Sequence, residues 1–146
     1  MNDFGQCPTE GAIGLLTLLI RSGRFAESRL DDDLAAAGLT FMKWRTLDVL
    51  VKAESPVSLG ALADLLHCVR SNVTQLVDKL EAELVVRRIA DPDDRRGTLV
   101  QLTETGCAAH ATGRKALESA TREVFAPFGE EDRSALRRLL VLLNGK

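Results

Sequence analysis

The segment "RSNVTQ", residues 70–75, carries side chains suited to contacting a nucleic acid. Arginine, serine, threonine, asparagine and glutamine hydrogen bond with phosphates and with the edges of bases. If residues 71–84 are helical, Val73, Leu76, Val77, Leu80 and Leu84 share one face and leave the other face polar. The polar candidates are Arg70, Ser71, Asn72, Thr74, Gln75 and Lys79.

A second candidate group lies in "RIADPDDRRGTLVQLTETG", residues 88–106. The β-branched run "VVRRIA" and the alternating "TLVQL" predict two strands, and "DPDDRRG" between them has the composition of a turn. The tip of this hairpin carries Arg95 and Arg96. A neighbouring carboxylate such as Asp94 can orient a guanidinium, and an oriented arginine suits the negative potential of a narrow minor groove.

These two groups need elements that position them. "SLGALADLLH", residues 58–67, predicts a short helix with Ser58 as its N-cap, and the helix of residues 71–84 follows after a brief turn. An ordinary helical hairpin with a polar outer surface is the alternative at this point. The β-hairpin that follows directly favours a winged helix-turn-helix instead.

Further helices flank this unit. We expect one from near Thr9, either continuous or broken at Gly23, and one capped by Thr40 whose apolar face is Phe41, Trp44, Leu47 and Val51. A long helix capped by Thr103 should end at Pro127, and a last helix carries the stripe Leu136, Leu139, Leu140 and Leu143.

The expected fold is therefore mainly α with a small β-hairpin wing, an α+β winged helix-turn-helix, in one domain spanning residues 1–146. Residues 40–102 should form the DNA-binding lobe. The terminal helices, residues 9–37 and 104–146, should form a dimerisation lobe, because both are apolar and lie outside the winged helix. Packing of the last helix on the preceding one within the same chain is compatible with this.

Composition narrows the function classes. The chain has 146 residues, 45% of them hydrophobic and 27% charged, with a net charge of −2. The longest apolar run, residues 12–20, is shorter than the roughly 20 residues of a membrane span, and the first residues lack a basic signal region, so we expect a cytoplasmic protein without a membrane partner. No nucleophile elbow, phosphate-binding glycine loop or catalytic histidine pair is present, so we predict neither an enzyme nor a cofactor.

Charge alone does not mark a nucleic-acid surface. Between His67 and Val100, six arginine or lysine residues accompany six acidic residues. Binding to DNA would therefore require the two signs to be separated in space.

The three cysteines suggest two minor alternatives. Cys68 precedes the second helix of the pair, where a buried inert thiol is expected and a redox-sensitive thiol is the alternative. Cys7 would lie on the N-terminal tail, from which it could cross a dimer. Cys107 and His110 share a helix face but have no clear third ligand, so we predict no metal site.

The order of elements and the wing motif resemble the MarR family of transcriptional regulators. The specific part is Asp94-Arg95-Arg96 followed by Leu102, Thr103 and Gly106. The resemblance implies a homodimeric repressor on a pseudo-palindromic operator of double-stranded DNA, released by a small aromatic or acidic ligand or, in some members, by thiol oxidation or a metal. It also implies that the polar residues of the segment 70–75 face bases or phosphates, and that Arg96 reads the minor groove with Asp94 as its partner.

Two positions depart from the family pattern, which has glycine at both. His67 occupies the corner of the helix-turn-helix, and histidine tolerates a positive φ better than most residues. Leu84 occupies the exit of the recognition helix, where either leucine adopts the strained left-handed conformation or, as we favour, the helix runs on and the turn is made differently.

The resemblance further places an effector pocket between the two lobes. We expect Phe41 and Trp44 in its wall, with Arg45 or Arg21 as a carboxylate anchor. The rival function is a winged helix that contacts proteins only, and a weak dependence of binding on salt would distinguish it from a DNA-binding protein.

Overall fold

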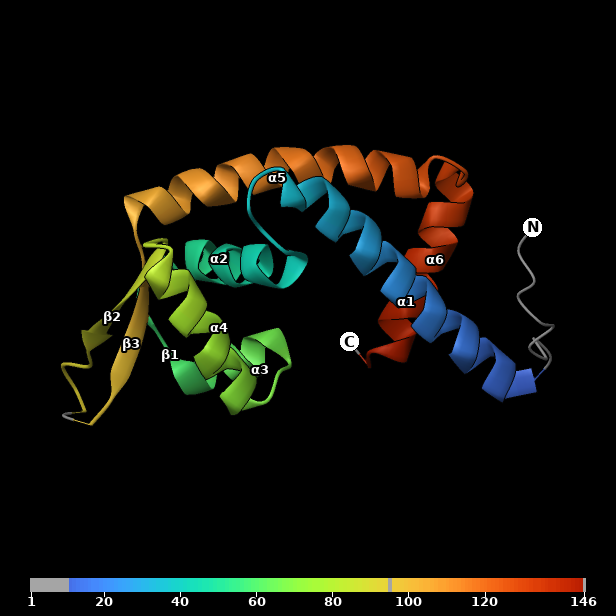
Figure 1. Cartoon of the computed structure of the whole chain (residues 1–146). Helices are drawn as coiled ribbons and strands as arrows, with labels where there is room; N and C mark the ends of the chain where they lie inside the picture. Colours follow the sequence, from blue (N-terminus) through green and yellow to red (C-terminus); the bar gives the residue numbers. More distant parts are fainter. Residues whose placement is uncertain (1–10, 95, 146) are drawn as a thin grey trace.

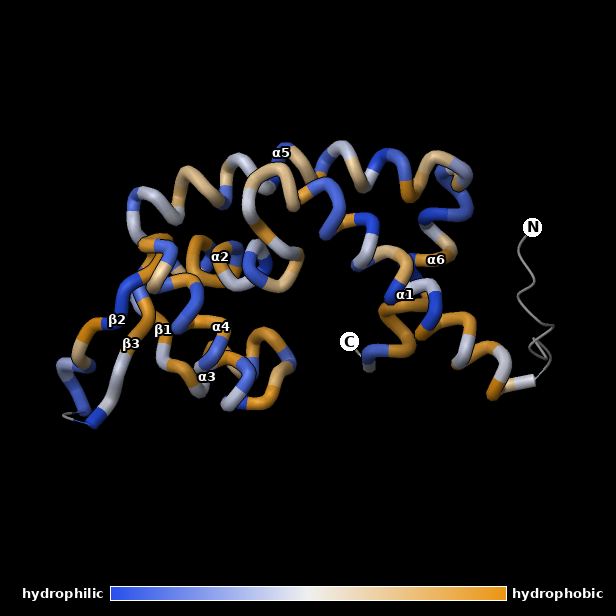
Figure 2. Tube along the Cα trace, viewed as in Figure 1, coloured by the Kyte–Doolittle hydropathy of each residue, from blue (hydrophilic) through white to orange (hydrophobic). Residues whose placement is uncertain are grey.

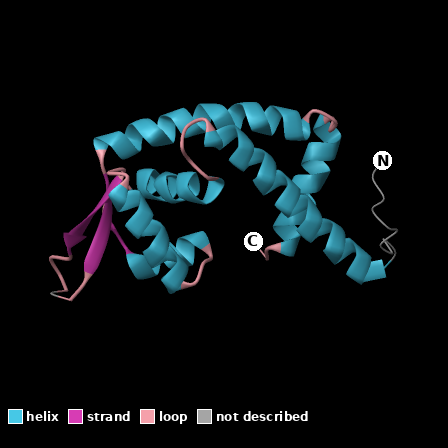
Figure 3. Ribbon diagram, viewed as in Figure 1, coloured by secondary structure: helices cyan, strands magenta, loops and turns pink. Residues whose placement is uncertain are grey.

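The structure is a computed structural model that describes residues 11–94 and 96–145 (Figure 1). Cys7, Thr9 and Arg95 therefore lie outside the described residues. Six helices and three strands follow in the order α1 Gly11–Ala35, α2 Phe41–Ala53, β1 Val57–Ser58, α3 Leu59–Leu66, α4 Arg70–Ala82, β2 Val86–Ala90, β3 Thr98–Leu102, α5 Glu104–Phe125 and α6 Glu130–Leu143. The helical class and the small wing predicted from the sequence are confirmed (Figure 3).

The helix starts follow the predicted capping residues. The side chains of Thr40, Ser58 and Thr103 accept hydrogen bonds from main-chain N–H groups three residues on, at 3.3, 3.2 and 3.0 Å. Each cap satisfies one of the N–H groups that the first turn of a helix leaves free. α1 runs through Gly23 without a break, which settles the alternative left open by the sequence.

The wing belongs to a three-stranded antiparallel sheet in the order β1-β3-β2. β2 and β3 form the predicted hairpin, with Arg88 opposite Val100. β1 was not predicted, because two residues between Pro56 and α3 are too short to show a strand pattern. Its residue Val57 pairs with Val100, so the central strand β3 ties the wing to the helix-turn-helix.

A single apolar core lies beneath α3 and α4. It joins the inner faces of α2, α3 and α4 to the sheet, and its fully buried members include Leu47, Leu62, Leu66, Val77, Leu80, Val86 and Val100. α1 contributes Leu34 at its C-terminal end and packs along α5, which lies over α2 (Figure 1). Val51 was expected on the buried face of α2 but is 38% exposed, because α2 packs through Thr46, Leu47 and Leu50.

The two ends of the chain leave apolar surface uncovered. The N-terminal half of α1 exposes Ile13, Leu15, Leu16, Leu18 and Ile20. α6 has no buried residue, although its leucines follow the predicted stripe (Figure 2). None of the described helices is long and apolar enough to cross a membrane.

Candidate nucleic-acid interface

The turn between α3 and α4 is built on His67. Its backbone is left-handed, with φ 53°, and its N–H hydrogen bonds back to the carbonyl groups of Ala63 and Asp64. The prediction that histidine makes this corner in place of glycine is confirmed. The turn sets α4 across α3 and leaves the first turn of α4 at the surface.

The N-terminal half of α4 presents the polar face that the sequence predicted. Arg70, Ser71, Asn72 and Gln75 are exposed, whereas Val73, Val77 and Leu80 are buried. Thr74 is half-buried, and its hydroxyl donates to the carbonyl of Arg70 at 3.0 Å. Four of the five predicted contact residues of α4 are therefore exposed.

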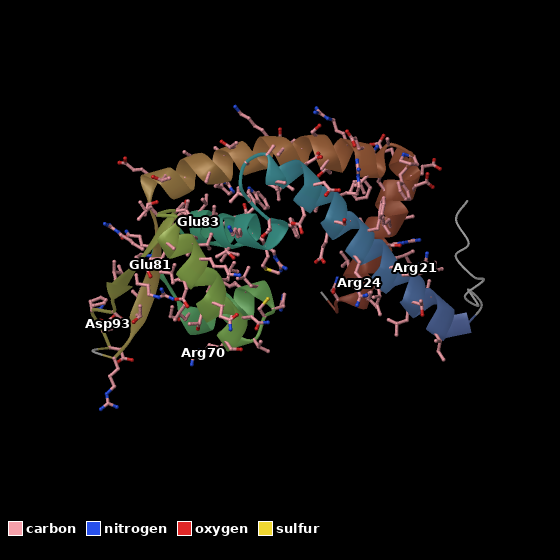
Figure 4. All side chains as sticks on the ribbon, viewed as in Figure 1. Arg21, Arg24, Arg70, Glu81, Glu83 and Asp93 are labelled. Carbon is pink, nitrogen blue, oxygen red and sulfur yellow. The ribbon has the colours of Figure 1, made fainter. Side chains whose placement is uncertain are left out.

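Arg70, labelled in Figure 4, is the first residue of α4. A Cβ atom placed on Gly60 in α3 would be 2.6 Å from Nη2 of Arg70. Glycine at this position leaves room for the guanidinium to rest against α3 while remaining exposed. No local pattern in the amino-acid sequence indicates this contact.

The wing tip is shaped by its aspartates. Asp91 accepts a hydrogen bond from the main-chain N–H of Asp93, and Asp94 accepts one from the main-chain N–H of Arg96, both at 2.9 Å. The carbonyl of Asp94 also accepts from the N–H of Gly97 at 2.8 Å. Aspartate commonly closes turns in this way, because its short side chain reaches an amide two residues on.

These contacts differ from the expected role of Asp94. Its carboxylate binds the backbone of Arg96, and among the described residues the Arg96 side chain makes no ion pair. Asp94 therefore positions the turn instead of the guanidinium. The exposed Arg96 side chain extends from the tip.

The exit of α4 decides between the two alternatives for Leu84. The favoured one is wrong, because the helix ends at Ala82 instead of running on, and Leu84 adopts the strained left-handed conformation, φ 60°, that glycine would adopt more easily. The Leu84 carbonyl accepts a hydrogen bond from the Thr103 hydroxyl at 2.7 Å. Gly106, also in the first turn of α5, packs so closely against this segment that a Cβ atom there would lie 2.0 Å from the carbonyl oxygen of Val85. These two contacts from the start of α5 hold the backbone at Leu84 in place.

A cluster centred on Arg88 joins the wing to the recognition helix α4. Its guanidinium forms an ion pair with Glu81, a second with Asp78 at 2.5 Å, and a longer contact with the carbonyl of Thr74 at 3.5 Å. Glu81 also accepts the main-chain N–H of Arg88 at 2.9 Å. Sequence reasoning counted these charges but missed their pairing, because the partners come from different elements.

This cluster and a neighbouring pair separate the charges of the interface. The N–H and guanidinium of Arg88 hold the pKa of Glu81 below its usual value. Lys43 of α2 pairs with Glu83 at 2.5 Å. The three acidic residues near the end of α4 are therefore each paired with a cation, although Arg88 serves two of them and one net negative charge remains, whereas Arg70 and Arg96 stand at the outer ends of α4 and the wing.

The polar end of α4 and the wing tip face the same way. Both lie on the side of the lobe away from α5, with Arg70 and Asp93 marking their positions (Figure 4). A helix and a hairpin that project side by side can enter adjacent grooves of a DNA duplex.

A cavity of about 530 Å³ lies between α1, α2 and α5. Phe41 and Trp44, which were predicted here, supply apolar wall. The charged lining consists of two ion pairs, Lys52 with Asp48 at 2.6 Å and Arg114 with Glu118 at 3.6 Å. Neither Arg45 nor Arg21 lines the cavity.

Beside this cavity, Trp44, His110 and Asp48 form a packed group. The rings of Trp44 and His110 stack with centroids 5.3 Å apart, and Nε2 of His110 lies 3.1 Å from a carboxylate oxygen of Asp48. Burial opposes ionisation of Asp48, but hydrogen bonds and charges from Lys52 and His110 outweigh it and lower the pKa of Asp48. His110 thus has structural partners on two sides.

The described cysteines fit structural roles. Cys68 is half-buried against the core, with its sulfur 3.5 Å from the carbonyl oxygen of Leu66. Cys107 is exposed, whereas His110 on the same helix is turned inward to Asp48. The described ranges contain no group of three or more histidine, cysteine and acidic residues able to hold a metal ion.

Comparison with known proteins agrees with this geometry. Residues 37–97 match the model of the MarR family. The HTH-type transcriptional regulator MhqR of Bacillus subtilis is 31% identical over 99 residues, which cover 67% of each chain. The homoprotocatechuate degradative operon repressor of Escherichia coli is 30% identical over 103 residues, 70% of this chain and 68% of that one.

The fold is that of solved structures in the same family. A mutant MarR of E. coli, in a crystal structure with operator DNA, superimposes with a TM-score of 0.86 over 94% of this chain and 99% of that one, at 20% sequence identity. At that identity the similarity concerns the fold alone. From the relatives, the matched segment and the winged helix together, we conclude that this chain belongs to the MarR family, which consists of transcriptional regulators and not enzymes.

Proposed function

We propose that the chain regulates transcription by binding a specific operator, with α4 in the major groove and the β2–β3 wing at the adjacent minor groove. The common orientation of the polar end of α4 and the wing tip carries this proposal. The proposed base and phosphate contacts are Arg70, Ser71, Asn72, Thr74 and Gln75 of α4 and Arg96 of the wing. Arg95 is assigned to the wing from its place in the sequence alone.

The active form in this proposal is a homodimer. α6 has no buried residue, and α1 exposes a row of isoleucines and leucines, so both helices have apolar surface that a second copy would cover. A two-fold dimer would present two α4 helices about 34 Å apart, one turn of DNA, and would match a pseudo-palindromic operator.

We further propose that the protein is a repressor released by a small ligand in the cavity between α1, α2 and α5. The E. coli relative is named as the repressor of a degradative operon, which supports this sense of regulation. The aromatic walls of Phe41 and Trp44 suit a planar ligand, and an acidic group on it would have to compete with the carboxylates that already pair with Lys52 and Arg114. Because α2 carries the winged helix and α5 the proposed dimer lobe, a ligand between them would change the spacing of the two α4 helices.

The first experiment is fluorescence anisotropy of the purified protein with DNA from upstream of its own gene, across a salt series. Random DNA of equal length is the control. We expect tight, sequence-selective binding that weakens steeply as salt rises, because contacts to phosphates release counterions. Weak binding that ignores both sequence and salt would contradict DNA recognition at this site and favour a role in protein contacts.

A further inference from the structure

The Arg88 cluster is placed to do more than neutralise charge. Arg88 lies in the middle of β2, the outer strand of the sheet, and its side chain crosses to α4. There it contacts Asp78 and Glu81 and reaches the carbonyl of Thr74, in the part of α4 that faces the proposed groove. One side chain thus spans the recognition helix from its exit almost to its contact face.

We propose that Arg88 is a positioning residue that fixes the angle between α4 and the wing, and so makes their two DNA contacts cooperative. This inference rests on the proposed function, since it concerns how two contacts act together. Glu81 accepts both the guanidinium and the main-chain N–H of Arg88, which fixes the strand as well as the side chain. The planar fork of arginine can bind two carboxylates at once, which the single ammonium of lysine cannot reproduce in the same geometry.

The physical need for such a residue comes from the wing itself. A two-stranded hairpin alone is marginally stable in water. The short strand β1 pairs only with the base of this hairpin, and in the described part of the chain no other strand lies beside its tip. If the hairpin is held at a fixed angle, binding of α4 brings the wing to its groove at a high effective concentration. If the angle is free, the wing contact must offset the cost of ordering the hairpin.

The chain offers a matched control in the next residue. Arg87 lies in the same strand and carries the same charge, but its guanidinium donates to Gln101 across the hairpin, at 2.9 and 2.7 Å, and among the described residues it has no side-chain hydrogen bond or ion pair to α4. Arg87→Gln therefore removes a wing charge and leaves the contacts between the wing and the helix in place.

The test is a double-mutant cycle on operator affinity. Arg96→Ala is measured in the wild-type, Arg88→Gln and Arg87→Gln backgrounds. We expect it to weaken binding about tenfold in the wild-type and Arg87→Gln proteins but only about twofold in Arg88→Gln, because an unfixed wing has already lost most of its contribution. The same tenfold loss in all three backgrounds would overturn the proposal.

A second measurement does not depend on DNA. Amide hydrogen exchange of the free protein should be at least tenfold faster across β2 and β3 in Arg88→Gln than in Arg87→Gln, with exchange in α2 and α3 equal in the two variants. Arg88→Lys should restore the slow exchange of β2 and β3 only in part. Equal wing exchange in Arg88→Gln and Arg87→Gln would refute the positioning role, whether or not the wild-type protein binds an operator, so the two proposals can fail separately.

Discussion

Trp44 and His110 are joined twice across the boundary between α2 and α5. Their rings stack at 5.3 Å, and the indole Nε1 of Trp44 donates to the main-chain carbonyl of His110 at 3.1 Å. The side chain of His110 in turn contacts Asp48 of α2. The winged helix is therefore attached to α5 by a compact polar and aromatic contact beside the cavity.

Replacement of Gly113 should disturb this contact. A Cβ atom at Gly113 would lie 2.4 Å from Cδ1 of Trp44 and 3.0 Å from Leu39, so α2 and α5 would have to separate. We expect Gly113→Ala to lower the free energy of unfolding by about 1–3 kcal/mol, measured by urea denaturation.

Gly23→Ala is the matched control for that variant, because a Cβ atom there meets no atom within 4 Å. In the middle of α1 it should raise stability by up to about 1 kcal/mol. A Gly113→Ala protein as stable as Gly23→Ala would contradict the close approach of α2 and α5.

At the left-handed Leu84 we expect a substitution by glycine to stabilise the protein. Its side chain is 71% exposed, so little packing is lost when it is removed, and glycine adopts φ 60° without steric cost. Leu84→Gly should stabilise the protein by about 1 kcal/mol, whereas Ala82→Gly, in the last turn of α4, should destabilise it by about 1 kcal/mol. Thermal unfolding of the pair would check this, and a destabilised Leu84→Gly would contradict it.

The sequence predicted well what local signals determine. Thr40, Ser58 and Thr103 were recognised as caps because each hydrogen bond spans only three residues, and the hairpin was recognised from its turn composition. At the exit of α4 the less favoured of the two alternatives holds, because Thr103 and Gly106, some twenty residues further along the chain, hold Leu84 in a conformation that leucine disfavours locally.

In the candidate site, too, the features that depend on local sequence were predicted, and those that depend on packing between elements were missed. The polar face of α4 follows from helical spacing and was predicted. The clamp of Arg88 on Asp78 and Glu81, and the absence of Arg45 from the cavity wall, depend on how separate elements pack. Sequence charge counts treat such residues as independent, so the sum of zero over residues 67–100 concealed which charges are paired.

Stability in acid should depend on Glu81. Its pKa is lowered in the folded protein, so its contribution is present at pH values above the ordinary glutamate pKa and is lost as pH falls through the lower, folded value. Glu81→Gln should therefore flatten the fall in urea midpoint between about pH 5 and pH 3. Arg88→Gln should remove only part of this contribution, because residue 88 keeps the main-chain N–H that binds Glu81. An unchanged acid slope in Glu81→Gln would count against the pairing.

Removal of Arg96 should separate binding from folding. The side chain is exposed and makes no described ion pair, so Arg96→Ala should leave the unfolding midpoint unchanged. Operator affinity should fall about tenfold, with a smaller salt slope. Lys115→Ala, which removes an exposed charge from α5, is the control and should bind normally; equal affinity of the two variants would refute the wing contact.

Removal of α6 should test the proposed dimer. A chain that ends at Gly129 lacks the leucine stripe, and we expect it to be monomeric or poorly soluble in analytical ultracentrifugation, because the proposed interface loses one of its two apolar helices. The full chain over the same concentration range is the control. A stable, soluble dimer of the truncated chain would contradict the assignment of α6 to the interface.

The bond between Glu81 and the Arg88 amide also bears on self-association of the wing. β2 is the outer strand, and the N–H of Arg88 points away from β3, into the row where a strand from another molecule could pair. Exposed rows of this kind seed aggregation, and proteins protect them with charge or with a covering side chain. Glu81 occupies the middle of the row and brings a carboxylate to it. The same contact that fixes the wing thus guards an exposed β-edge against fibril-like pairing.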